Sequence, residues 1–284
     1  MKTLQKTVIS TAAVALMAGL STVAFAADEP AAPEASPITA NVTVVNDYRY
    51  RGISQSNFKP AIQGGFDYAH ESGFYIGNWN SSISWISDSA SAGGSKNVSA
   101  PIEMDFYAGI KKELIGEGFA SDLGVLQYYY PTSGLVISGT QANPNTTEIY
   151  AAQNFTFGPL TGFAKFSYAA STLFGFAGST GSYYPDLTLN YDTGVWGLAL
   201  NAHVGYQYVA GNVQGSKPTV TNSSLYSYTD YKLGVTKDLG GGLSLAAAYV
   251  TTNAGKTGSA YNYSSPTNKN LGGSTGIVSL TKTF

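Results

Sequence analysis

The stretch Trp196-Gly-Leu-Ala-Leu-Asn-Ala-His-Val-Gly-Tyr-Gln-Tyr208 alternates between two kinds of residue. One face carries Trp196, Leu198, Leu200, Ala202, Val204, Tyr206 and Tyr208, and the other carries Gly197, Ala199, Asn201, His203, Gly205 and Gln207. A period of two is that of a β-strand. Aromatic residues at both ends of an apolar face are typical of a strand that crosses a bilayer between its two interfaces. The stretch therefore predicts a membrane-spanning strand.

The same alternation recurs along the chain. In residues 102–111 the apolar face carries Ile102, Met104, Phe106, Ala108 and Ile110, between Glu103, Asp105, Tyr107, Gly109 and Lys111. We predict strands at about residues 39–51, 61–70, 74–86, 102–112, 119–130, 147–157, 161–172, 185–192, 195–209, 227–238, 242–252 and 274–284.

The predicted connections sort by length. Every second connection is short, as at residues 71–73 and 193–194, whereas those between are long and polar, as at 87–101 and 253–273. Outer-membrane barrels have tight periplasmic turns and long outer loops. An unpaired backbone group in lipid costs several kcal/mol, so the sheet must close. We predict an all-β fold, a transmembrane antiparallel up-and-down β-barrel of about twelve strands, with short periplasmic turns and long outer loops.

Three segments are expected in the chain. Residues 1–26 are expected to be a signal peptide, because Lys2 and Lys6 precede the apolar run 8–20 and Ala24-Phe-Ala26 forms a cleavage site. Residues 27–38 are a Pro/Ala-rich periplasmic lead-in, since proline at this density fits neither sheet nor helix. Residues 39–284 are the outer-membrane β-barrel.

The composition favours a membrane protein and excludes several functions. Charged residues make up 11% of the chain and aromatic residues 13%, including 21 tyrosines. Too little charge remains to cover a soluble domain. The near-balanced charge argues against nucleic acid as a partner. The chain has no cysteine, which excludes a thiol-ligated centre, and we expect no cofactor.

Several segments resemble a known family. These are Asp47-Tyr-Arg-Tyr-Arg-Gly-Ile-Ser-Gln-Ser56, Pro60-Ala-Ile-Gln-Gly-Gly-Phe-Asp-Tyr-Ala-His70, Ser72-Gly-Phe-Tyr-Ile-Gly-Asn-Trp79, Tyr128-Tyr-Tyr-Pro131 and Leu280-Thr-Lys-Thr-Phe284. They are similar to the TorF-type porin family of proteobacteria. The resemblance implies an outer-membrane barrel that conducts solutes, and it implies no particular substrate.

Strand parity places a set of charged side chains inside the predicted barrel. They are Asp47, Arg49, Arg51, Asp67, Glu103, Asp105, Lys111, Asp122, Lys165 and His203. Fixed charges of this kind set the ion preference of a polar lumen; alternatively, they form salt bridges that plug a narrow barrel. Twelve strands lie between the filled eight-stranded and the open sixteen-stranded barrels, so the sequence leaves both open. Guanidinium groups bind anions bidentately, which makes Arg49 and Arg51 candidates for a small anionic guest.

The remaining motifs have simpler interpretations. His70 precedes a predicted turn, and His203 lacks a nearby G-x-S-x-G nucleophile motif, so we expect no enzyme. Glu103 and Asp105 share a strand face and could hold Ca²⁺, but solvated carboxylates are the simpler reading. We expect Tyr48, Tyr50, Trp85, Tyr128, Tyr168, Tyr206, Tyr208 and Tyr249 to be anchors at the outer interface. Platforms for sugar in the lumen are the alternative for a few aromatic residues.

The sequence as a whole predicts a porin-like channel in the outer membrane of a Gram-negative bacterium, for passive passage of small hydrophilic solutes. Its expected partners are outer-membrane lipid, those solutes, and the barrel assembly machinery, which would engage the last strand ending in Phe284. The alternative is a structural or surface-interaction barrel with a closed lumen, whose outer loops bind a partner.

Overall fold

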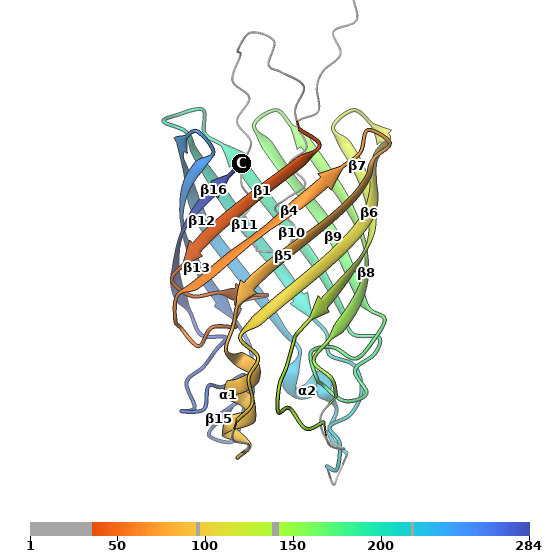
Figure 1. Ribbon diagram of the computed structural model, residues 1–284, viewed down its shortest axis with the longest axis vertical. Helices are drawn as coiled ribbons and strands as arrows, with labels where there is room; N and C mark the ends of the chain where they lie inside the picture. Colours follow the sequence, from red (N-terminus) through yellow and green to blue (C-terminus); the bar gives the residue numbers. More distant parts are fainter. Residues whose placement is uncertain (1–35, 95–96, 138–141, 217–218) are drawn as a thin grey trace, which may run out of the picture.

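Twelve strands form one closed antiparallel barrel in the computed structural model (Figure 1). The structure describes residues 36–94, 97–137, 142–216 and 219–284. The barrel strands are β1 (Ile38–Val45), β4 (Ala61–Ala69), β5 (Phe74–Ser82), β6 (Ile102–Gly116), β7 (Phe119–Tyr129), β8 (Thr146–Phe157), β9 (Leu160–Ala169), β10 (Tyr183–Asp192), β11 (Leu198–Gln207), β12 (Tyr228–Gly240), β13 (Leu243–Thr252) and β16 (Thr275–Thr283). Because β1 also pairs with β16, the ring has no free edge. The predicted fold class is confirmed.

The smaller elements all lie in the long connections. They are β2 (Arg49–Tyr50), β3 (Ile53–Ser54), α1 (Trp85–Ala92), α2 (Asn222–Tyr226), β14 (Lys256–Thr257) and β15 (Ala260–Tyr261). The long connections gather at one end of the barrel, at the bottom of Figure 1, and the short turns lie at the other end with the C-terminus. We name these the outer end and the inner end. Neither α1 nor α2, nor any other helix within the described ranges, has the length and apolar character to cross a membrane.

The strands bury one face and expose the other. Along β11, Leu200, Val204 and Tyr206 are exposed on the outside, whereas their neighbours Asn201 and Gln207 are buried inside. Similar apolar side chains project outward all round the ring, among them Ile62, Phe106, Leu123, Ile149, Phe166, Leu187, Leu233, Leu245 and Leu280. This is the apolar-out, polar-in arrangement of a barrel surrounded by lipid.

The predicted first strand, residues 39–51, is wrong beyond Val45. The Asn46 side chain bonds to the neighbouring β16, donating to the Gly276 carbonyl at 3.1 Å and accepting from the Val278 amide at 2.8 Å, and the chain then turns inward. Arg51 and Gly52 have left-handed φ angles of 46° and 76°. Two such residues in succession form the tight turn of a hairpin. Residues 47–58, which include β2 and β3, therefore fold as a separate hairpin, called the inner hairpin below.

Four predicted interfacial anchors are also wrong. Tyr48 and Tyr128 are each 2% exposed and point into the barrel, because the first belongs to the inner hairpin and the second lies on the inward face of β7. Tyr50 is half-buried against Tyr128. The predicted strand 74–86 ends at Ser82, and Trp85 begins α1 instead of facing lipid.

The two predicted segments before the barrel lie mostly outside the described residues. This holds for the whole predicted signal peptide, residues 1–26, and for the lead-in up to residue 35.

Candidate functional site

The inner hairpin crosses the outer end of the barrel interior. Its side chains reach β6, β8 and β11, and the Cβ that an alanine would add at Gly52 would lie 2.4 Å from Thr252 on β13. The hairpin therefore spans between walls that are far apart in the ring, so that any solute passing along the barrel must pass it.

Arg51 at the tip of the hairpin is fully engaged. Its Nη2 donates to both carboxylate oxygens of Glu148 on β8, at 2.9 and 2.7 Å, and its Nη1 donates to Gln207 Oε1 on β11 at 2.6 Å. The guanidinium also lies 4.1 Å from the centroid of the Tyr184 ring. The side chains of Arg51 and Glu148 are 6% and 1% exposed. This buried, charge-assisted pair and the bond to Gln207 together hold the hairpin against two walls.

Arg49 and Tyr48 anchor the base of the hairpin. Arg49 Nε donates to Asp47 at 2.6 Å, and Nη1 donates to carbonyl oxygens of Gly52, Leu271 and Gly273. The Tyr48 hydroxyl donates to Glu103 on β6 at 2.6 Å. These bonds make the hairpin a fixed part of the interior.

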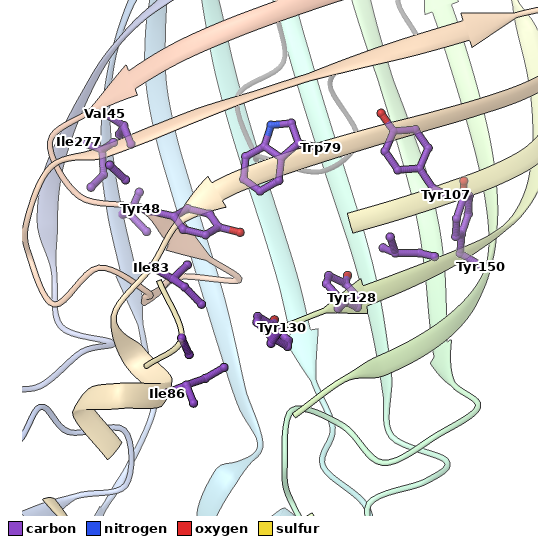
Figure 2. Close-up of a cluster of buried hydrophobic side chains, with 14 of the residues drawn as sticks. Val45, Tyr48, Trp79, Ile83, Ile86, Tyr107, Tyr128, Tyr130, Tyr150 and Ile277 are labelled. Carbon is purple, nitrogen blue, oxygen red and sulfur yellow. The ribbon is translucent and has the colours of Figure 1, made fainter. Parts of the chain in front are cut away.

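Tyrosine hydroxyls satisfy most of the lumen carboxylates. Tyr130 donates to Glu103 at 2.8 Å, Tyr107 to Asp67 at 2.5 Å, Tyr75 to Asp122 at 2.6 Å and Tyr184 to Asp230 at 2.8 Å. Figure 2 shows Trp79, Tyr107 and Tyr150 among the side chains of this buried cluster inside the barrel.

Inward-facing glycines make room for these rings. An added Cβ would lie 2.4 Å from the Tyr107 ring at Gly77, and 2.4 Å from the Tyr150 ring at Gly124. Such distances are too short for any Cβ, so the rings lie flat on the wall only because the neighbouring strand carries glycine there. The glycines thus let bulky tyrosines line the wall and reach the carboxylates.

The lysines and the histidine of the interior lie on β6, β9, β11 and β12. Lys165 Nζ is 3.8 Å from Asp186, and His203 Nε2 is 3.0 Å from Asp230. Lys111 on β6 and Lys232 on β12 make no ion pair with any described residue.

The structure places all ten predicted lumen residues inside the barrel or in the inner hairpin. It brings Asp47 together with Arg49, and Glu103 close to Asp105, whereas Arg51 pairs with Glu148. Sequence reasoning missed several partners that strand parity could have found, namely Glu148, Asp186, Gln207, Asp230 and Lys232.

The interior has two contrasting walls. The acidic wall is the inward face of β6, β7 and β8, with Glu103, Asp105, Asp122 and Glu148 beside Tyr107, Tyr128 and Tyr150. The neutral wall is the inward face of β1, β13 and β16, with Thr43, Ser244, Ala246, Ala248, Ile277, Ser279 and Thr281. Neither charge nor aromatic ring faces inward from the described residues of the neutral wall.

A cavity of about 500 Å³ lies on the outer side of the inner hairpin, among the outer connections. Its floor includes Tyr50, Arg51 and Ser54, and its sides come from α1, α2 and the loops after β9 and β15. Of the described residues that line it, eight are aromatic and only Arg51 is charged. Its size lies within the ~300–1,000 Å³ range of small-molecule pockets.

The described part of the chain contains no group of three or more His, Cys, Asp or Glu residues arranged to hold a metal ion. At Glu103, the two carboxylate oxygens are instead occupied by the hydroxyls of Tyr48 and Tyr130.

Fold and interior together define a twelve-stranded transmembrane β-barrel with a loop folded into its outer end. The chain belongs to the bacterial family described as "Bacterial protein of unknown function (Gcw_chp)", whose model matches residues 27–284. No curated protein matches the sequence.

Solved structures of porins are similar to this chain. A KdgM porin matches with a TM-score of 0.48 at 6% identity, covering 87% of this chain and 98% of the porin. The NanC porin matches with a TM-score of 0.49 at 8% identity, over 87% of this chain and 98% of the porin. OccAB3 of Acinetobacter baumannii matches with a TM-score of 0.43 at 9% identity, over 88% of this chain and 65% of that protein.

Proposed function

We propose that the protein is an outer-membrane channel through which small hydrophilic solutes pass passively. One observation carries the proposal: the barrel interior holds more charged groups than its own ion pairs neutralise. Lys111 and Lys232 have no carboxylate oxygen within 4 Å among the described residues, and one buried carboxylate oxygen of each of Asp67, Asp105 and Asp186 accepts no hydrogen bond. Burying such groups in a dry interior is costly, whereas a water-filled lumen solvates them.

The charge balance of the lumen favours cations. Seven buried carboxylates lie on the inward faces of the strands, namely Asp67, Glu103, Asp105, Asp122, Glu148, Asp186 and Asp230. Only Lys111, Lys165 and Lys232 oppose them there, and the inner hairpin adds one further positive charge. Because Arg49 and Arg51 are committed to Asp47 and Glu148, the initial hypothesis of an anion site at these arginines loses its support. A lumen with excess carboxylate raises the local cation concentration.

The difference between the two walls indicates the route that a solute would take through the barrel. Tyrosine rings thicken the acidic wall, whereas the neutral wall carries mainly smaller side chains, such as alanine, serine and threonine. We infer that solutes enter through the outer cavity, pass the inner hairpin and continue along the neutral wall. The resemblance to TorF-type porins supports the same class of function. An outer-membrane location fits the apolar outer surface, and the last strand ending in Phe284 would be recognised by the barrel assembly machinery.

A closed barrel that binds a partner through its outer loops is the second candidate. It is favoured by the number of bonds that fix the inner hairpin between walls, because a fixed hairpin can also seal the lumen.

Conductance of the purified barrel in planar lipid bilayers separates the two functions. The channel proposal predicts discrete ohmic steps and, in a salt gradient, a reversal potential that shows preference for cations. A shift of gel mobility on boiling would first confirm that the protein is folded. Silence from folded protein would favour the closed barrel.

A further inference from the structure

The outer cavity combines aromatic faces with very little charge. Rings of Phe176, Tyr226 and Tyr263 pack on one another with centroid distances of 4.6, 5.9 and 6.4 Å, and Tyr228 joins them at 5.2 Å from Tyr263. Across the cavity, Trp85 lies edge-on to Tyr130 at 5.5 Å. The lining thus offers flat apolar surfaces from several connections that are distant in the sequence.

Apart from Arg51, the hydrogen-bonding side chains in this lining are uncharged, and some have no partner among the described residues. Trp85 Nε1 is buried and donates to no acceptor. The hydroxyls of Tyr226 and Tyr228 bond to no described residue, although both side chains line the cavity. Burial raises the pKa of the Tyr226 phenol, which keeps it protonated as a donor. A buried tryptophan or tyrosine normally finds a partner for its polar atom, so these groups indicate a ligand that supplies oxygen acceptors.

The charge of the cavity decides between classes of ligand. Arg51 is the one charged lining residue among those described, and its donors are directed to Glu148 and Gln207. An anionic ligand would have to displace Glu148, which would leave that carboxylate buried without a counter-charge. A cationic ligand would be repelled by the positive charge of the Arg51 guanidinium group. Aromatic faces with neutral donors fit a ring that has apolar C–H faces and hydroxyl groups at its edge.

We propose that the outer cavity is a binding site for uncharged saccharides, which stack on its aromatic rings and accept hydrogen bonds from Trp85, Tyr226 and Tyr228. The physiological meaning of the site, as the point where the channel captures its solute, rests on the proposed channel function. Binding itself does not, because a closed barrel would bind the same sugar.

Isothermal titration of the folded barrel in detergent micelles tests the site, with maltotriose, cellotriose and chitotriose as uncharged probes and trigalacturonate as the charged one. We expect at least one uncharged trisaccharide to bind and to bind more tightly than trigalacturonate. Trp85→Phe keeps a ring but removes the donor, so it should weaken that binding by about threefold to tenfold. Tyr226→Phe should have a similar effect, and it provides a second variant if Trp85→Phe does not fold.

Trp196→Phe is the matched control, since Trp196 lies in the turn between β10 and β11 at the inner end and is 80% exposed. Its affinity should equal that of the unsubstituted protein. Failure of all three uncharged sugars to bind, or tighter binding of trigalacturonate, would overturn the proposal. Binding by a protein that is silent in bilayers would support the site while removing the channel, and conductance without sugar binding would remove the site alone.

Discussion

The acidic wall and the neutral wall of the barrel differ in the size of their inward side chains and in the bonds that those side chains make. In the closed strand order β7 and β8 lie opposite β13 and β16. The first pair carries large rings and carboxylates that bond to one another, whereas the second carries alanine, serine and threonine with few bonds across the interior. The comparison shows that side chains can fill the interior of this barrel on one side without filling it equally on the other. The acidic wall binds Arg51 and Tyr48 of the inner hairpin, whereas the neutral wall carries smaller side chains, beside which we propose that the passage lies.

Removing the Arg51 side chain should have the largest effect. Arg51→Ala leaves Glu148 on the acidic wall buried without its counter-charge, so we expect the free energy of unfolding to fall by about 3–5 kcal/mol. Urea unfolding in micelles measures it. Arg51→Ala combined with Glu148→Gln should recover much of the loss, because the stranded charge is gone. A single variant within about 0.5 kcal/mol of the parent would show that the pair does not hold the hairpin.

Replacing a glycine by alanine should lower the stability of the protein where a tyrosine ring packs on that glycine, as on the acidic wall, and should not do so on β16. In Gly124→Ala the new Cβ would lie 2.4 Å from the Tyr150 ring, and we expect a loss of about 1–3 kcal/mol in the free energy of unfolding. Gly276→Ala on β16 is the control, since no atom lies within 4 Å of its added Cβ. Equal stability of the two variants would mean that the rings do not lie flat on the glycines.

Narrowing the neutral wall should reduce conductance. Ala246 on β13 faces inward, so Ala246→Trp places a bulky ring in the inferred passage, and we expect the single-channel conductance to fall by about half or more. Ala247→Trp puts the same ring on the exposed lipid side of the strand and should leave conductance unchanged. If the two variants conduct alike, solutes do not pass along the neutral wall.

Removing the Asp105 charge from the acidic wall should have the smallest effect, a change in ion preference. Asp105 is 1% exposed and its Oδ1 accepts no hydrogen bond, so its charge would act on a passing cation through the field of the lumen and not by contact. Asp105→Asn should lower the cation-to-anion permeability ratio by about twofold, measured from the reversal potential in a salt gradient. Ser279→Ala on the neutral wall should not change it. A ratio unaffected by Asp105→Asn would assign the ion preference to other residues.

Strand parity predicted the ring of strands and the inward position of residues such as Asp67, Glu103 and Asp122, because the two faces of each strand meet different solvents. It failed at residues 46–51, where alternation continues into a hairpin that is not part of the wall. The Arg51-Gly52 pair followed by Ile53 was the available signal.

The side chains that bind the inner hairpin could not be predicted from the sequence, for a different reason. Arg51 meets Glu148 and Gln207 across separations of 97 and 156 residues. Those contacts depend on the curvature of the closed barrel and on how far the loop bends inward. Neither the curvature of the barrel nor the bend of the loop can be predicted from the local periodicity of the sequence.

Replacing the inner hairpin tests the central claim most directly. Val45 and Ala61 are cross-strand partners, so an Asn-Gly turn can join β1 to β4 in place of residues 46–60, with Glu148→Gln to avoid a stranded charge. In planar bilayers, folded protein of this kind should conduct at least about twice as much per step as the parent, because the hairpin and not the barrel diameter limits the passage. An unchanged step size would contradict the account.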